Sequence, residues 1–198
     1  MIDVVIVNWN SGDMLSNCVS SILNGNSDSI GKIIIVDNGS EDGSENLQIE
    51  SNQVLLIKNP SNYGFAKSCN IGARHGKGEY VLFLNPDTVL EPDTLKRTIN
   101  YMEKDSNEMV GISGIQLCYE DGNVARHSSR FPSPFSFFMR SSGLHKIFLS
   151  LDHVLTEWNH LDTREVPHVI GAYFFVRKQL YNSLNGFDER FFVYLEDL

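Results

Sequence analysis

The sequence is poor in cysteine, lacks long apolar runs and has no excess of basic residues. Its three cysteines, Cys18, Cys69 and Cys118, are far apart and form no Cys-x-x-Cys pattern. This favours buried, reduced thiols over a disulfide framework or a zinc site. No apolar run reaches the roughly 20 residues that a membrane-spanning helix needs. Met1 leads directly into a predicted strand without a signal peptide, so we expect a cytoplasmic protein.

The charge balance is acidic. The formal net charge of -9 argues against a nucleic-acid partner, because proteins that bind nucleic acids carry basic stripes. An acidic chain that binds a nucleotide diphosphate needs a cation or helix N-termini to offset the repulsion. The length of 198 residues and the hydrophobic content of 41% are those of one globular domain with a full core.

Apolar segments typical of strands alternate with segments typical of helices in the first hundred residues. We expect strands at 2–7, 32–36, 54–57 and 80–84, and helices at 14–23 with Asp13 as N-cap, through Leu47 and Ile49, at 65–75 and at 92–104. This alternation predicts an α/β fold with a mostly parallel sheet covered by helices. Ligands of such sheets bind beyond the carboxyl ends of the strands.

The remaining part has a different pattern. We expect a strand at 110–119, a hairpin turn at Asp121-Gly122, a strand at 168–176 and a short helix at 177–184. Residues 126–165 show little periodicity, which is typical of a functional flap.

Polar clusters follow each predicted parallel strand at its carboxyl end. They are Asn8-Trp9-Asn10, Asp37-Asn38, Asn59 and Asn85 with Asp87. Clusters placed at random would fall as often on the opposite edge. Their convergence predicts a single site of nucleotide size.

The segment Asn85-Pro86-Asp87 is the most informative cluster because it ends a strand that is apolar throughout. Pro86 holds Asn85 in an extended conformation. Asp87 is the best candidate ligand for Mg²⁺ or Mn²⁺, with Asn85 as a weaker partner, because these ions at phosphate sites need only one or two carboxylates. The alternative is that Asp87 caps the following turn.

Asp37 can accept a hydrogen bond from the imide N–H of uracil or thymine, or it can close an Asx-turn with Asn38 and Gly39; both can hold at once. Asn8 and Trp9 can flank the same base, although Trp9 is otherwise expected in the core.

Two further places have candidate residues. The segment 62–66, with Asn62, Gly64 and Phe65, and Asn70 beyond it, lies at a predicted helix N-terminus that favours anions. Glu196 and Asp197 follow an aromatic run, where burial raises a carboxylate pKa and suits a general base. Alternatively, these two acids simply start a helix. His168 opens a predicted strand and is the histidine to follow.

Several of these motifs occur in an order that resembles a known family. The chain resembles family 2 glycosyltransferases of the GT-A fold, and in particular their rhamnosyltransferase-like branch, at residues 4–10 (VVIVNWN), 36–44 (VDNGSEDGS), 62–66 (NYGFA), 85–87 (NPD), 186–192 (GFDERFF) and at Glu196-Asp197. The resemblance implies inverting transfer of a sugar from a nucleotide diphosphate to an acceptor hydroxyl. The expected donor is a UDP- or dTDP-sugar such as dTDP-L-rhamnose, and the acceptor a saccharide or lipid-linked saccharide in cell-surface polysaccharide synthesis.

The resemblance also implies roles for single residues. Asp87 corresponds to the metal-binding aspartate, Asn85 replaces the first aspartate of the Asp-x-Asp element, Asp37 corresponds to the base-contacting position and Asp197 to the catalytic base, with Glu196 beside it. Gly171 and Ala172, after His168, correspond to the segment beneath sugar and acceptor. The residues expected to contact the nucleotide are Asn8, Trp9, Asn10, Asp37, Asn38, Asn62, Gly64, Phe65, Asn70 and Asn85.

We therefore expect one GT-A domain over 1–198, with a nucleotide-sugar-binding half at 1–110 and an acceptor-side half at 111–198. Relatives continue into further helices, so we expect the chain to be truncated at its C-terminus. Residues 131–151, with Arg130, Arg140 and Lys146, are expected to form an acceptor flap; the alternative is a peripheral contact at the inner face of the plasma membrane.

Two other functions are compatible with a nucleotide-binding sheet. A sugar nucleotidylyltransferase would have a Gly-rich, Arg-containing loop after its first strand, but Asn8-Trp9-Asn10-Ser11-Gly12 stands there. A nucleotide-sugar binding module without activity would result from C-terminal truncation.

Overall fold

The computed structural model describes residues 1–49, 51–125, 128–131, 133–143, 154–155 and 158–193. The chain forms two compact units. The first comprises residues 1–113 together with the described residues from 171 onward, and the second comprises residues 114–170. The expected division at residue 110 into a donor half and an acceptor half concerns function and stays a prediction.

A six-stranded sheet forms the centre of the first unit, in the order β3-β2-β1-β4-β8-β5. The first four strands of the chain, β1 (Ile2–Asn8), β2 (Ile30–Asp37), β3 (Val54–Lys58) and β4 (Tyr80–Leu84), are parallel. By contrast, β8 (Tyr173–Arg177) runs antiparallel to β4 and to β5 (Ile112–Ser113). The α/β fold with a mainly parallel central sheet is thus confirmed.

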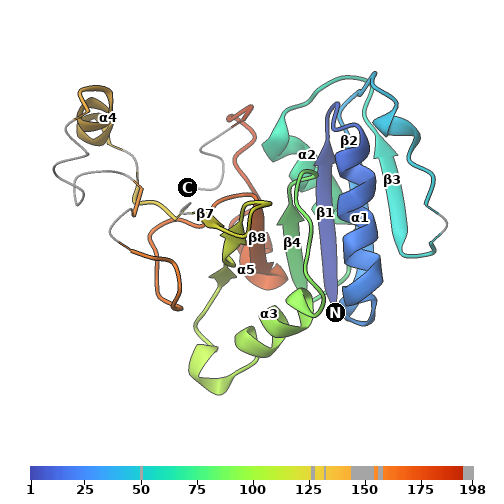
Figure 1. Ribbon diagram of the computed structural model, residues 1–198. Coiled ribbons are helices and arrows are strands. Elements are labelled where there is room, and N and C mark those ends of the chain that lie inside the picture. The colour runs from blue at the N-terminus through green and yellow to red at the C-terminus, as the bar shows by residue number, and fades with distance from the viewer. Residues whose placement is uncertain (50, 126–127, 132, 144–153, 156–157, 194–198) are drawn as a thin grey trace. The chain divides into compact units, whose positions relative to one another are not determined.

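Helices cover both faces of this sheet (Figure 1). The longest, α1 (Asp13–Asn26), lies in front of β1 and β2, and α2 (Phe65–His75) lies behind the sheet. Gly72 of α2 packs against Val5 and Val36 so closely that a Cβ there would collide with Val5. The other helices of the unit are α3 (Thr94–Met102), α5 (Lys178–Ser183) and the 3-10 turns η1 (Ser27–Ser29), η2 (Ser44–Asn46) and η3 (Asp105–Asn107).

The core sits on both sides of β1, β2 and β4, whose apolar residues are buried along their whole length. Parallel strands covered on both faces read as continuous apolar runs, which is why β4 was predicted with its observed bounds. Aromatic side chains extend the core to β8 and to the turn after α5: the ring centroid of Phe83 lies 6.3 Å from that of Phe174 in β8 and 4.8 Å from that of Phe187.

Some predicted elements are wrong. Asp13 begins α1 rather than capping it, because Gly12 is the residue before the helix and Asp13 makes no side-chain cap. Leu47 and Ile49 are not helical; the 3-10 turn η2 precedes them, and residues 47–49 have no regular secondary structure. The strand expected at 110–119 is divided between β5, which pairs with β8, and β6 (Leu117–Cys118), which pairs with β7 (Val124–Ala125).

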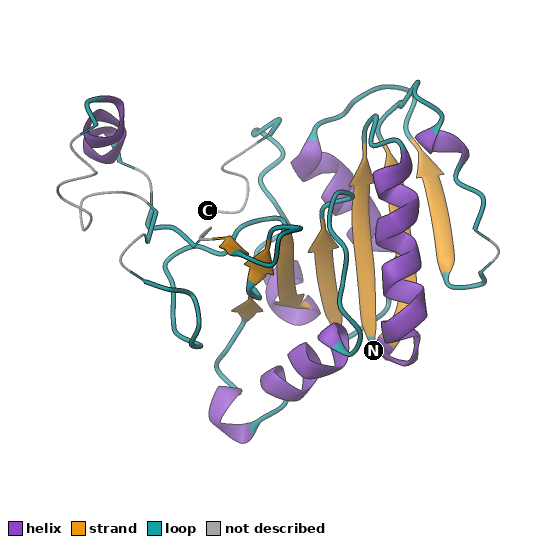
Figure 2. Cartoon of the chain, in the orientation of Figure 1, coloured by secondary structure: helices purple, strands orange, loops and turns teal. Residues whose placement is uncertain are grey.

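The second unit contains the β6–β7 hairpin and α4 (Pro134–Ser141) (Figure 2). The predicted turn at Asp121-Gly122 is confirmed, since Gly122 has a φ of 80° and donates its N–H to the carbonyl of Tyr119. Ser129 forms isolated antiparallel β-bridges with Val154 and with His168. No helix among the described residues has both the length and the apolarity to cross a membrane.

Candidate active site

The strand order reverses between β1 and β4, since β2 follows β1 on one side and β4 lies on the other. Ligands of parallel sheets bind in the crevice at this point, beyond the carboxyl ends of the strands. The two strands end in Asn8 and just before Asn85. The predicted polar clusters do therefore meet at one edge of the sheet.

A network of buried polar side chains joins the ends of β1 and β2. Asn8 is fully buried, and its Nδ2 lies within hydrogen-bonding distance of Asp37 Oδ1 (2.7 Å), Ser44 Oγ (2.9 Å) and Ser40 Oγ (3.1 Å). Its Oδ1 is buried without a hydrogen-bond partner among the described residues. Orphaned buried acceptors are rare in native proteins and mark functional sites or ordered waters.

Asp37 closes the Asx-turn that was one of its two predicted roles. Its Oδ2 accepts from the N–H groups of Gly39 and Ser40, each at 3.1 Å, and the residue is only 1% exposed. A carboxylate has about four lone-pair sites, so the second role, a contact with the base, remains a prediction.

The loop after β1 is tied to the loop after β2. The backbone N–H of Asn10 donates to Ser40 Oγ (2.9 Å) and that of Gly12 donates to Asp42 Oδ2 (2.7 Å). Hydrogen bonds lower the pKa of Asp42, and the bond from the Ser44 hydroxyl has the largest effect. Trp9 is 58% exposed, so the expectation that it lies in the core is wrong, and its ring is open to a ligand.

Asn38, Asn59 and Ser68 form a second network that joins the end of β2 to α2. Asn38 Oδ1 accepts from Ser68 Oγ (2.6 Å) and Asn59 Nδ2 (2.9 Å), and Asn38 Nδ2 donates to the carbonyl of Gly64 (3.3 Å). Sequence reasoning did not find Ser68, although its place one helical turn after Gly64 is a signal for such a contact.

The N-terminus of α2 is partly occupied by the chain itself. Asn62 Oδ1 accepts from the N–H of Gly64 (2.9 Å), and the N–H of Phe65 donates to the carbonyl of Phe192 (2.8 Å). Gly64 has a φ of 85°, and a Cβ there would lie 2.6 Å from the Phe192 oxygen. At the predicted anion site, the N–H of Phe65 is therefore already bonded to the backbone of Phe192, a contact that the sequence did not predict.

Asn70 makes contacts that were not predicted. Its amide makes hydrogen bonds with the backbone of Phe187 and with the side chains of Tyr181 and Glu189. Two donors and two acceptor sites are thus all in use. These partners were not predicted, because residues 70 and 187 meet only through the tertiary fold, and a nucleotide contact of Asn70 stays a prediction.

The turn after β4 presents the predicted metal ligand to solvent. Asp87 is exposed, and Thr88 closes the turn by donating its N–H and its hydroxyl to the carbonyl of Asn85. The alternative role of Asp87 as a turn cap is therefore filled by Thr88. Cys18 of α1 lies against the same turn, and burial raises the pKa of its thiol to about 12; the Thr88 hydrogen bond opposes this rise and the Asp87 charge adds to it.

This turn fits a hard divalent cation held together with a ligand. Asp87 and Asn85 offer side-chain oxygens that make no hydrogen bond among the described residues. The described part of the chain contains no cluster of three or more His, Cys, Asp or Glu able to hold a metal alone. Mg²⁺ and Mn²⁺ sites of one or two carboxylates are completed by substrate phosphates and waters.

Ala172 lies beside this turn, because its carbonyl accepts from the N–H of Asn85 (3.2 Å) and β8 starts opposite the end of β4. Gly171 immediately precedes it. His168 belongs to the second unit, where its Nδ1 lies 2.8 Å from Ser129 Oγ. The predicted catalytic residues Glu196 and Asp197 lie outside the described residues.

Known proteins share this sequence pattern and this fold. The model of the family described as Glycosyl transferase family 2 matches residues 3–184. Glycosyltransferase GlyG of Streptococcus pneumoniae is 28% identical over 69% of this chain and 52% of its own length. Poly(ribitol-phosphate) beta-N-acetylglucosaminyltransferase TarP of Staphylococcus aureus is 30% identical over 63% of this chain and 42% of its own length.

Solved structures show the same fold. S. aureus TarS 1-349 in complex with UDP has a TM-score of 0.68 at 15% identity and covers 99% of this chain and 52% of its own. The mannosyltransferase PcManGT from Pyrobaculum calidifontis, in complex with GDP-Man and Mn²⁺, has a TM-score of 0.63 at 18% identity, over 99% of this chain and 49% of its own.

The chain spans about half the length of the curated relatives it matches. The rhamnosyltransferase-like branch stays a prediction, since the relatives above are not named for rhamnose transfer. The family match extends from the first strand to the helix that follows β8. The chain therefore belongs to glycosyl transferase family 2.

Proposed function

We propose that this domain binds a nucleoside-diphosphate sugar at the carboxyl edge of β1, β2 and β4 and transfers its sugar, with inversion, to an acceptor hydroxyl. The observation that carries the proposal is the exposed Asp87 at the end of a fully buried strand, beside the point where the strand order reverses. Asn8, Asp37 and the exposed Trp9 ring lie at the same edge.

The donor we propose is a UDP- or dTDP-sugar, with dTDP-L-rhamnose among the candidates. Asp37 is a hydrogen-bond acceptor, which complements the imide N–H of uracil and thymine and not the unprotonated ring nitrogen of cytosine. TarS, which shares the fold, is known in complexes with UDP and UDP-GlcNAc.

The metal we propose is Mg²⁺ or Mn²⁺, held by Asp87 with help from Asn85. A bound divalent cation supplies several kcal/mol of charge stabilisation to a departing diphosphate. The chain's net charge of -9 favours such compensation near a diphosphate. PcManGT, which shares the fold, is known in complex with Mn²⁺ and a nucleotide sugar.

In the reaction, the acceptor hydroxyl attacks the anomeric carbon from the face opposite the diphosphate. The new carbon–oxygen bond forms as the bond from the sugar to the diphosphate breaks, and Asp197 takes the hydroxyl proton, with Glu196 beside it. A positioned base contributes about 10²–10⁴-fold to such a step. We place the sugar beside Gly171 and Ala172, which is supported by the hydrogen bond from the N–H of Asn85 to the carbonyl of Ala172.

The acceptor we propose is a saccharide or lipid-linked saccharide used in a cell-surface polymer. This is supported by TarP, a relative named for transfer to poly(ribitol-phosphate). We also propose that the protein works in the cytoplasm, with a peripheral contact at the inner face of the plasma membrane, where it would reach a lipid-linked acceptor.

A donor panel in the full-length protein tests the function. Wild-type protein with Mn²⁺ should turn over a UDP- or dTDP-sugar, and Asp197→Asn should bind the same donor with unchanged affinity but turn it over about 10²–10⁴-fold more slowly. Unchanged turnover in Asp197→Asn would remove this residue as the base. A wild-type protein that binds the donors without consuming any would instead be a binding module.

A further inference from the structure

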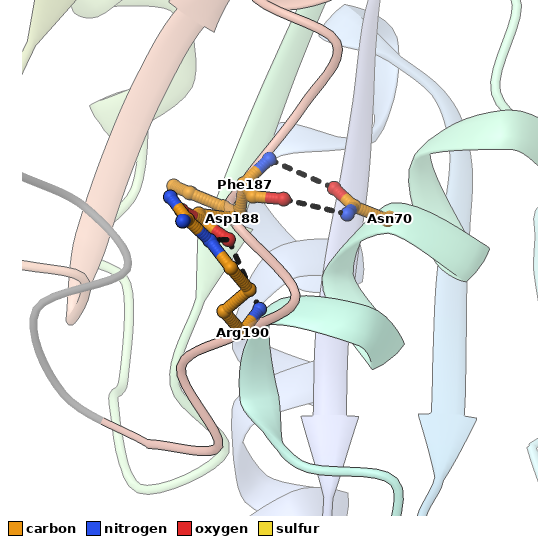
Figure 3. A network of polar contacts seen from close by, with 4 residues as sticks. All are labelled: Asn70, Phe187, Asp188 and Arg190. Atoms are coloured by element: carbon orange, nitrogen blue, oxygen red, sulfur yellow. Dashed lines mark hydrogen bonds and ion pairs between the residues drawn. The ribbon is translucent and has the colours of Figure 1, made fainter.

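The Asn70 side chain pairs with the backbone of Phe187 as a second peptide group would (Figure 3). Asn70 Nδ2 donates to the Phe187 carbonyl and Oδ1 accepts from the Phe187 N–H, both at 2.9 Å. The residue is 6% exposed and stands in the middle of α2. The Asn70 side chain thus makes the two hydrogen bonds that a neighbouring strand would make with Phe187, although the two residues are 117 positions apart in the sequence.

The other groups around Asn70 fix the orientation of its amide. Its Oδ1 also accepts from the hydroxyl of Tyr181, and its Nδ2 also lies 3.0 Å from Glu189 Oε1. Gly186 has a φ of 81°, and a Cβ there would collide with the Asn70 oxygen. The turn at 186–189 is therefore shaped to the amide, which presents an N–H donor and a carbonyl acceptor side by side.

A second attachment lies nearer to the site. We call residues 186–193 the strap. Its first part contacts Asn70 in the middle of α2. Its last part lies at the N-terminus of α2, where the carbonyl of Phe192 accepts a hydrogen bond from the Phe65 N–H (2.8 Å). Because α2 follows β3, this end of the helix lies at the carboxyl edge of the sheet, with Asn38 bonded to Gly64. The strap thus runs along α2, from the middle of the helix to its N-terminus at the carboxyl edge of the sheet, where Asp37 and Asn38 lie.

We propose that Asn70 is a positioning residue for the proposed catalytic carboxylate: it clamps the strap to α2, and the strap directly precedes the segment of the sequence that carries Glu196 and Asp197. This inference rests on the proposed function, in which Asp197 is the base. Asp197 is only five residues beyond Phe192 in the sequence, so the second attachment of the strap is the last hydrogen bond before it that the described residues show. Loss of the clamp leaves the donor's own contacts on β1, β2 and β4 in place.

The chain offers a matched control for a buried helix asparagine. Asn26 of α1 is 5% exposed, and its amide also bridges backbone groups: Oδ1 accepts from Leu95 N–H (2.9 Å) and Nδ2 lies 3.4 Å from the Glu91 carbonyl. It makes no contact with the strap among the described residues. Asn26→Asp therefore reproduces the stability cost of the substitution without its effect on the strap.

The test compares Asn70→Asp with Asn26→Asp in the full-length protein. Asp has the same shape as Asn but cannot donate to the Phe187 carbonyl, and it repels Glu189. We expect Asn70→Asp to lower kcat about 10²-fold, the cost of a small misplacement of a catalytic group. The donor KM and the nucleotide Kd should stay unchanged, and hydrogen exchange in the strap should accelerate. Asn26→Asp should lose stability but keep kcat.

Two results would overturn the inference: unchanged kcat in folded Asn70→Asp, or a parallel loss of kcat and donor affinity. If Asn70→Asp does not fold, Tyr181→Phe removes a single bond to the amide; it should lower kcat at unchanged Kd, and an unchanged kcat would count against the clamp. An inactive wild-type protein would instead refute the proposed function, so the two failures are distinguishable.

Discussion

Asn8 and Asp37 serve the fold, and we propose that they also meet the nucleotide. Both were predicted from their place after a strand, and both are buried in a network that the chain makes for itself. The Asx-turn at Asp37 is local and was expected from Asp37-Asn38-Gly39. The partners Ser40 and Ser44 could not be predicted, because only the parallel pairing of Asn8 with Asp37 brings them to Asn8.

The cysteines make a prediction at the same scale. Cys18 and Cys69 are buried as expected, but Cys118 is exposed, which corrects the expectation that all three are buried. A thiol reacts as its thiolate. Because burial raises the pKa of Cys18 to about 12, it stays protonated up to strongly alkaline pH.

A thiol reagent at pH 8 should therefore label Cys118 rapidly in the native protein, and Cys18 only after unfolding. Mass spectrometry of the labelled peptides measures this. Rapid native labelling of Cys18 would show that α1 does not cover the thiol as the structure has it. Cys118→Ser should abolish the fast phase.

At the scale of elements, α2 and β4 have the bounds that the sequence predicts. Helix α2 begins after Gly64 and ends just before Gly76, and β4 is a short apolar run, so both are specified locally. The strand expected at 168–176 is observed only from Tyr173 to Arg177, where it pairs with β4 and β5. Its start depends on partners that are distant in the sequence.

The packing of α2 on the sheet gives the element-scale prediction. A methyl group at Gly72 would collide with Val5 and approach Val36, so Gly72→Ala should destabilise the protein by about 1–3 kcal/mol, although Ala is the better helix former by about 1 kcal/mol. Urea unfolding measures the change.

Lys67→Ala, at an exposed position of the same helix, is the control and should leave stability nearly unchanged. Val5→Ala in the Gly72→Ala background restores space and should recover part of the loss. A Gly72→Ala protein as stable as the wild type would contradict the close packing of α2.

At the scale of the whole molecule, the fold class follows from the alternation of strands and helices. The strand order 3-2-1-4 reverses between the paired strands β1 and β4, and this is where we propose the site. The antiparallel strand β8 and the clamp between Asn70 and Phe187 do not follow from any local pattern, since both join segments about a hundred residues apart. The sequence thus predicts where a ligand binds better than how the distant part of the chain is held there.

The central claim is that Asp87 holds a divalent cation against the diphosphate of a donor nucleotide. Calorimetric titration of UDP, dTDP, CDP and GDP with and without Mn²⁺ measures it most directly, in wild type, Asp87→Asn and the control Asp93→Asn, which alters an exposed aspartate before α3. Mn²⁺ should strengthen binding of UDP or dTDP in the wild type and in Asp93→Asn, and this gain should disappear in Asp87→Asn. Tight CDP binding, or the same Mn²⁺ effect with Asp87 replaced, would contradict the account.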